Sequence, residues 1–358
     1  MLGRAILRRR TVHRGVMTRP SFLARAGVLL AVSATLLASP RVVRTAGAAA
    51  APSHWQHIGL PRTTVRALAV GQIHPGLLFA ATEKGLYRRD RRHPWRRVLA
   101  GQAVWDAILL HGDRTVIAGD SAGNVDISAD GGAHWRQSLV TVTGVYAVTV
   151  PPGDPAVLLA GGGGGIYVSR DGGARWDHRL SLPDGTVDAF AWQPGSRRVV
   201  FAASVGGSPQ AKAGVYISRD AGMTWREYGR HLDSPGGVMS LAVPSGTSVF
   251  AGTMGHAVRT VARSGGTWHA TASGMPVSND HVAAMLGIPG RPLTLYAGTL
   301  GYGVYVTGDG GRHWTRISRG LPASHNASFV FSIAYSPLDH VLYAGTMDGV
   351  YRLRVAGL

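Results

Sequence analysis

The sequence predicts an all-β fold, specifically a seven-bladed β-propeller with four strands in each blade. Three observations predict it: one short motif recurs along the chain, strand-like segments flank each copy in the same order, and the repeat length is that of a propeller blade. The 358 residues include 50 glycines without the three-residue period of collagen. Such a composition fits many short strands joined by tight turns, because glycine readily adopts positive φ.

The recurring motif has the pattern Ser/Thr-x-Asp-x-Gly-x-x-Trp, which we call the Asp box. The chain has four full copies of the box and two degenerate ones. The degenerate copies run from Asp90 to Trp95 and from Ser264 to Trp268. The four full copies are Ser128–Trp135, Ser169–Trp176, Ser218–Trp225 and Thr307–Trp314.

Each residue type in the box has a structural use. An aspartate can accept hydrogen bonds from the backbone N–H groups of its own turn, and glycine permits a left-handed backbone. A tryptophan buried between blades contributes roughly 3–5 kcal/mol. We therefore expect the box residues to be framework rather than catalysts or ligands of a metal; they are Asp130, Trp135, Asp171, Trp176, Asp220, Trp225, Asp309 and Trp314.

Strand-like segments surround every box in one order. Before it come a segment such as Val65–Val70, a second such as Leu77–Ala81, a glycine-containing turn, and a third such as Gly85–Tyr87. The run Gly161–Gly165 is expected to be one of these turns. Four strands, a to d, therefore make each unit, and the box forms the hairpin between c and d.

Counting the box tryptophans gives the number of units. Trp95, Trp135, Trp176, Trp225, Trp268 and Trp314 follow one another at intervals of 40, 41, 49, 43 and 46 residues. The last unit begins near Phe329 and ends after its third strand, whereas Ser53–Pro61 resembles an isolated fourth strand. Joining the two gives seven blades and closes the ring without an open sheet edge.

The first 51 residues are expected to lie outside the propeller of residues 52–358. They hold nine arginines and no acid, and Ala26–Ser39 is a 14-residue apolar stretch followed by small residues at Ala46–Ala51. This is the pattern of a signal peptide, with an uncleaved anchor as the alternative and Met17 as a possible true start. We expect a secreted, periplasmic or cell-envelope protein, with a possible membrane tether through this segment.

Charge and cysteine content exclude some kinds of functional site and partner. No cysteine is present, which excludes disulfides, thiolate metal sites and a cysteine nucleophile. Of the formal charge of +18, nine charges lie in the first 51 residues. The remaining arginines permit an anionic partner, but we favour arginines spread over exposed strand faces, and no nucleic acid is expected.

The boxes resemble those of the bacterial neuraminidase (BNR) repeat family, which includes sialidases. That resemblance implies an arginine triad, a tyrosine nucleophile activated by glutamate, and an aspartic acid. The chain has only two glutamates, Glu83 and Glu227, and only Arg66 is an arginine among the first positions of the innermost strands. Sialidase activity is therefore not expected.

Ligands should meet the face opposite the boxes, where the d–a and b–c loops gather. The sequence predicts that the first positions of the innermost strands are Arg66, Asp106, Tyr146, Asp188, Met239, Ala283 and Phe331, with Glu83, Lys84, Asp120, Asp280, His325 and Asn326 in loops nearby. The alternative is a set of solvated loop residues with an Arg66–Asp106 pair. The candidate ligand-binding residues are Arg66, Trp105, Asp106, Tyr146, Asp188, His281 and Tyr302.

Two functions remain from the sequence. The first is an exported, monomeric, non-catalytic scaffold that binds a protein or polysaccharide of the cell envelope, without cofactor or metal. It is supported by a resemblance to photosystem II stability/assembly factors and to sortilin-like propellers, which bind polypeptides. The second is a glycoside hydrolase of the sialidase or xyloglucanase type, for which Asp106 and Asp188 are the candidate carboxylates.

Overall fold

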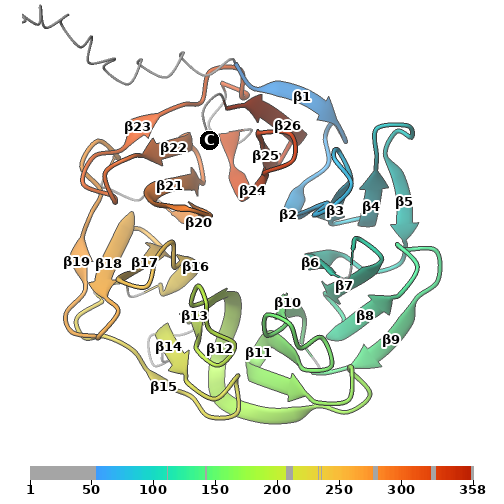
Figure 1. Cartoon of the computed structure of the whole chain (residues 1–358), viewed down its shortest axis with the longest axis horizontal. Helices are drawn as coiled ribbons and strands as arrows, with labels where there is room; N and C mark the ends of the chain where they lie inside the picture. The colour runs from blue at the N-terminus through green and yellow to red at the C-terminus, as the bar shows by residue number, and fades with distance from the viewer. Residues whose placement is uncertain are drawn as a thin grey trace, which may run out of the picture. The chain divides into compact units, whose positions relative to one another are not determined.

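The computed structural model describes residues 54–110, 112–141, 143–206, 213–232, 234, 236–276, 281–323 and 328–355, so the expected export segment lies outside the described residues. The strands form sheets arranged as a ring around a central channel, which is a β-propeller (Figure 1). The described part of the chain contains no helix able to cross a membrane.

Five sheets in the described residues have four antiparallel strands each, ordered from the channel outward. They are β2 (Val65–Val70), β3 (Leu78–Thr82), β4 (Gly85–Arg89) and β5 (Arg96–Leu99); β6 (Val104–Leu110), β7 (Thr115–Asp120), β8 (Asn124–Ser128) and β9 (Arg136–Leu139); β16 (Val238–Ala242), β17 (Ser248–Thr253), β18 (Val258–Ala262) and β19 (His269–Ala270); β20 (Val282–Ile288), β21 (Arg291–Thr299), β22 (Gly303–Thr307) and β23 (Thr315–Arg316); and β24 (Val330–Ser336), β25 (Val341–Thr346), β26 (Gly349–Arg354) and β1 (Gln56–Gly59).

The sixth sheet has six strands, and it makes the predicted count of seven four-stranded sheets wrong. β11 continues through Gly161–Gly165, the expected turn, and β12 continues from an outer into an inner position. The two strands pair on both sides of a register shift, at Gly163↔Thr186 and Gly164↔Leu182. The strands of this sheet are β10 (Val145–Thr149), β11 (Leu158–Ser169), β12 (Asp177–Trp192), β13 (Val200–Gly206), β14 (Gly214–Ser218) and β15 (Arg226–Glu227).

The chain's first described strand closes the ring, as the sequence predicts. β1 pairs antiparallel with β26, with Gln56 opposite Arg352. Just before β1, Trp55 is 2% exposed, and its indole Nε1–H donates a 2.7 Å hydrogen bond to the carbonyl oxygen of Ile317 in the preceding sheet. The closing strand is therefore held on both sides, by its own sheet and by the sheet before it (Figure 1).

The innermost strands share a feature that the sequence analysis missed. In each, the inner segment begins with a valine that is at most 1% exposed and carries a register shift, a β-bulge, directly after that valine. In six of the seven this valine is the strand's first residue, whereas β12 begins at Asp177 and reaches its inner segment at Val187. A bulge turns the extra residue away from its sheet. The seven strands are β2, β6, β10, β12, β16, β20 and β24, and their valines are Val65, Val104, Val145, Val187, Val238, Val282 and Val330.

Each valine packs against a small residue of the strand pair before it, which belongs to the preceding sheet in every case except Val187, whose partner lies on β11 of the same sheet. At Gly119 of β7, an added Cβ would lie 2.7 Å from Cγ1 and 2.8 Å from the carbonyl oxygen of Val145. No real Cβ fits at such distances, so only glycine lets the two sheets approach this closely. The same contact recurs at Gly161–Val187, Gly252–Val282, Gly298–Val330 and Gly345–Val65, whereas Ala81 and Ala203 take the glycine's place beside Val104 and Val238.

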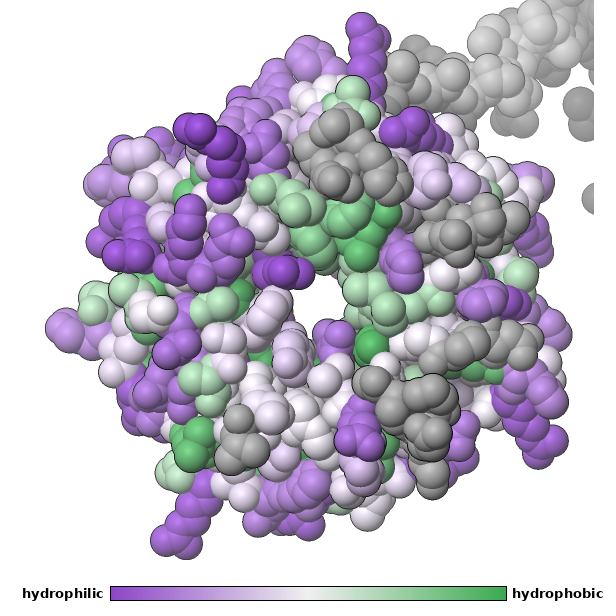
Figure 2. Space-filling model, turned by 180° about the vertical axis from the view of Figure 1, so that it is seen from behind, coloured by the Kyte–Doolittle hydropathy of each residue, from purple (hydrophilic) through white to green (hydrophobic). Residues whose placement is uncertain are grey.

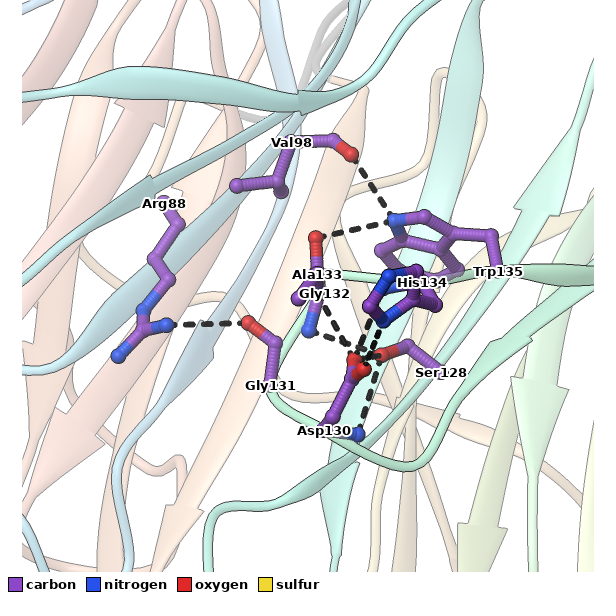
Figure 3. Close-up of polar contacts among 9 residues, drawn as sticks. All are labelled: Arg88, Val98, Ser128, Asp130, Gly131, Gly132, Ala133, His134 and Trp135. Carbon is purple, nitrogen blue, oxygen red and sulfur yellow. Dashed lines mark hydrogen bonds and ion pairs between the residues drawn. The ribbon is translucent and has the colours of Figure 1, made fainter.

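The Asp boxes hold the outer hairpins together, and Figure 3 shows the one that contains Asp130. Oδ1 of Asp130 accepts hydrogen bonds from the backbone N–H groups of Ala133 and His134, both 2.9 Å, and from the Ser128 hydroxyl at 2.8 Å. These bonds, above all the one from the His134 N–H, hold the pKa of Asp130 well below its usual range. Asp130 thus accepts hydrogen bonds from its own turn, and Asp171, Asp220 and Asp309 accept equivalent bonds in their boxes.

The box tryptophans connect neighbouring sheets. The Nε1–H of Trp135 donates to the carbonyl oxygen of Val98 on β5 at 2.9 Å, which ties β9 to the sheet before it (Figure 3). Trp225 is different, because its Nε1–H donates to Gly222 O in its own turn. The remaining bonds to the preceding sheet are Trp55–Ile317, Trp95–Ile58, Trp176–Ser138, Trp268–Tyr228 and Trp314–Thr271.

Gly119→Ala should destabilise the protein by about 1–3 kcal/mol, because the new methyl group would overlap Val145. Gly308→Ala is the matched control, since a Cβ there meets no atom within 4 Å. Urea unfolding measures both. Equal midpoints for the two variants would show that the glycine–valine contact is not tight.

Trp55→Ala should lower the free energy of unfolding by roughly 3–5 kcal/mol, because it empties a buried site where the ring closes. Leu139→Ala on β9 removes an apolar side chain that is 66% exposed, and it should cost little. Thermal melts compare the two variants. If Trp55→Ala melted with the wild-type protein, closure through β1 would not hold the ring.

Candidate functional site

The bulged residues of the seven innermost strands meet at the channel. They come at the start of each inner strand, and in an antiparallel blade this end lies opposite the c–d hairpin that holds the box. Together they line a cavity of about 330 Å³ in a channel that is open through the molecule (Figure 2). These residues are Arg66, Trp105, Tyr146, Asp188, Met239, Ala283 and Phe331.

Four of them form a continuous array across adjacent inner strands. The Arg66 guanidinium lies 4.6 Å from the ring centre of Phe331 and 4.8 Å from that of Trp105. Trp105 in turn contacts Tyr146, with ring centroids 5.5 Å apart and planes inclined by 45°. The array thus presents one cation between two aromatic rings, followed by a third ring.

Arg66 has no counter-ion among the described residues. Burial lowers its pKa, and the charge of Glu83 acts in the opposite direction without forming an ion pair. Nε of Arg66 and Nε1 of Trp105 are buried, and neither has a hydrogen-bond partner in the described part of the chain. Buried donors without acceptors are uncommon, and a bound ligand or ion is one of the explanations for them.

Asp106 is not at the bulged position of its inner strand, where the sequence alignment placed it. The bulge follows Val104, so Trp105 is the residue equivalent to Arg66, and Asp106 is equivalent to Ala67. The repeated valine was the sequence signal for this alignment. The Arg66–Asp106 pair, which belonged to the alternative interpretation of the sequence, does not form between these two described side chains.

Both oxygens of Asp106 are occupied by backbone groups. Oδ1 accepts from the N–H of Ala107 at 2.8 Å, and Oδ2 accepts from the N–H of Val148 on β10 at 2.9 Å. Burial raises the pKa of Asp106 to about 6, although these two hydrogen bonds act to lower it. Asp106 therefore connects two inner strands, β6 and β10.

Asp188 lines the same cavity and accepts fewer hydrogen bonds than Asp106. Its Oδ1 accepts a 2.5 Å hydrogen bond from the Thr186 hydroxyl, and burial raises its pKa. It is the bulged residue of β12, so its carboxyl group is placed at the channel.

Other candidates from the sequence lie elsewhere. His281 and Tyr302 are not among the described residues that line the channel cavity, and Asp120 lies in a separate cavity near β8. Asp280, His325 and Asn326 fall outside the described residues. Within the described ranges, no group of three or more histidine, aspartate or glutamate side chains is arranged to hold a metal ion.

Comparisons with known proteins identify the fold alone. The sequence matches no family model and no curated protein. Among solved structures, an ancestral GH74 enzyme is similar with a TM-score of 0.64 at 16% identity, over 84% of this chain and 46% of that one. YCF48 from Cyanidioschyzon merolae has a TM-score of 0.61 at 14% identity, over 85% of this chain and 99% of that one.

A third similar structure is the extracellular domain of the one-component system BT4673 from B. thetaiotaomicron. Its TM-score is 0.64 at 16% identity, over 84% of this chain and 40% of that one. The chain thus spans less than half the length of the GH74 and BT4673 structures it resembles. Both catalytic and non-catalytic propellers share this architecture, so function has to be argued from the site.

The raised pKa of Asp106 predicts a pH effect on stability. Asp106 binds a proton more tightly in the folded state, at a pKa of about 6, than in an unfolded chain, at about 3.9. Its contribution is fully present below about pH 3.9 and is lost as the pH rises through about 6. The stability of wild type relative to Asp106→Asn should therefore fall between pH 4 and pH 7, by up to about 3 kcal/mol. Urea unfolding across this range measures it, and a constant difference would contradict the assignment.

Proposed function

We propose that the protein is an exported, non-catalytic binding propeller whose channel mouth holds part of a protein or polysaccharide of the cell envelope. The observation that carries this proposal is the Phe331–Arg66–Trp105–Tyr146 array. Flat aromatic faces bind sugar rings or apolar side chains, and an arginine without a counter-ion attracts an acceptor group of the ligand. Export rests on the basic, then apolar, first 51 residues.

We further propose that the six-stranded sheet acts as two blades, giving seven repeats around the channel. β10 and β12 both contribute inner strands, and each has the valine and bulge of the other five. Under this proposal β11 and β12 bend where Gly164 and Asp184 have φ values of 82° and 58°. Under this proposal each repeat is counted by its inner strand with the buried valine and the bulge. The count is then seven, although the strand hydrogen bonds form six sheets.

A glycoside hydrolase is the alternative, and the geometry gives it less support. Such an enzyme needs two carboxyl groups free to act on the substrate. Both carboxyl oxygens of Asp106 accept hydrogen bonds from backbone N–H groups, those of Ala107 and Val148. Asp188 is then the one acid among the described residues of the cavity whose carboxyl group keeps an oxygen without a hydrogen bond. The likeness to GH74 enzymes supplies the fold and no catalytic pair.

Ligand binding can be followed through Trp105, which lies in the channel wall. Titration with defined envelope oligosaccharides and peptides should change the intrinsic fluorescence, and Trp105→Phe should remove most of that change. Arg66→Ala should weaken binding at least tenfold, because it removes both cation–π contacts and the positive charge. Arg312→Gln, an exposed arginine in the last box, is the control. Equal affinities for Arg66→Ala and Arg312→Gln would exclude the channel as the binding site.

Catalysis is tested separately on a panel of aryl glycosides. The proposal expects no turnover by the wild-type protein. Turnover that is abolished by Asp188→Asn would replace the binding proposal with the hydrolase. The purified variant must first show a wild-type thermal melt, so that loss of folding is not read as loss of catalysis.

A further inference from the structure

A second, separate cavity lies where the ring closes. We call it the seam groove; its volume is about 530 Å³, and it lies between the β24–β26–β1 sheet and the β2–β5 sheet. Arg89 and Arg91 line it from one side, and Arg352 and Arg354 of β26 line it from the other. These pairs are more than 250 residues apart in the sequence, so charge runs along the chain do not reveal the groove.

The groove's two carboxylates are already engaged. Asp339 pairs with Arg91 at 2.7 Å. Asp90 accepts hydrogen bonds from the backbone N–H groups of Arg92 and His93, at 2.9 and 2.8 Å, in the first, degenerate box. Three guanidinium groups therefore remain in the groove without an acid of their own among the described residues.

Each of these three arginines has at most a neutral partner. Arg89 donates to the carbonyl oxygen of Ile58 at 2.9 Å, and Arg352 donates to Oε1 of Gln56 at 3.2 Å. The guanidinium group of Arg354 has no hydrogen-bond partner in the described part of the chain, and the residue is exposed. Burial lowers the pKa of Arg89, and the nearby positive charge of Arg352 lowers it further. The like charges thus lie close enough to repel each other across the seam.

A tetrahedral oxyanion matches this arrangement. Guanidinium groups bind phosphate and sulfate oxygens through paired N–H donors, and a bound anion would cancel the repulsion. We propose that the seam groove binds a phosphate or sulfate group, either as the free ion or as an ester on a larger ligand. This site is independent of the channel proposed above.

Binding there has a consequence for folding. Arg89 lies on β4 and Arg352 on β26, so one anion would join the first sheet to the sheet that closes the ring. A ligand that binds only the folded state stabilises it in proportion to occupancy. Anion binding should therefore raise the melting temperature in a saturable manner.

The experiment is a series of thermal melts of the whole chain with increasing sodium sulfate or phosphate, at ionic strength held constant with sodium chloride. We expect a saturable rise in melting temperature for the wild-type protein. Arg354→Gln and Arg352→Gln should each weaken the apparent affinity about tenfold, the effect of losing one hydrogen bond to a charged group. Arg312→Gln removes the same charge from an exposed turn that does not line the groove, and it should leave the affinity unchanged.

Arg354 carries the decisive comparison, because its side chain is exposed and its replacement leaves the β1–β26 pairing intact. A linear rise in melting temperature of equal size in all variants would overturn the proposal, since that is a general salt effect. Dextran sulfate, with neutral dextran as control, then separates the two sources. Tighter binding of dextran sulfate, lost in Arg354→Gln, indicates an ester on a polymer, whereas equal affinity per sulfate indicates the free ion.

Discussion

The contact between a buried valine and a small residue of the neighbouring strands around the ring governs the rest of this structure. It occurs where each inner segment begins, and at five of the seven positions the small residue is glycine. Without a Cβ the backbones of neighbouring sheets approach to van der Waals distance, and the valine fills the remaining space. Since every sheet contributes to the contact on both sides, no sheet can move outward without opening a gap.

The same contact places the candidate site. With the valine fixed against its neighbour, the bulge that follows turns the next side chain toward the channel. The framework is therefore constant around the ring, while the bulged residue is free to vary between arginine, tryptophan, tyrosine, aspartate, methionine, alanine and phenylalanine. On the outside of the ring, the box turns and their tryptophans connect the outer strands of neighbouring sheets, and they do not line the channel.

Much of this could be predicted from the sequence, because the repeats are local. The boxes, the order of strands and the pairing of the Trp55 segment with the last sheet follow from spacing and residue type. The six-stranded sheet could not be predicted, because Gly161–Gly165 has the composition of a turn whether or not strands extend through it. The sequence alignment misplaces Asp106 by one residue, because it does not use the repeated valine, which makes Trp105 equivalent to Arg66.

The seam groove is a second feature that could not be predicted from the sequence. Arg89 and Arg354 come together only because the N-terminal strand closes the ring, so their shared charge is a property of the fold. Channel and groove are thus two results of one closure: inner strands converge on the first, and the first and last sheets meet at the second.

Native-state hydrogen exchange of a Val187→Ala variant tests this account most directly. Val187 is fully buried, and it packs on Gly161. If the valine contacts hold the ring as one cooperative unit, the substitution should lower the opening free energy of the amides in all seven innermost strands by the same amount, about 1–3 kcal/mol. Loss of protection confined to β11, β12 and β13, with the opposite side of the ring unchanged, would contradict it.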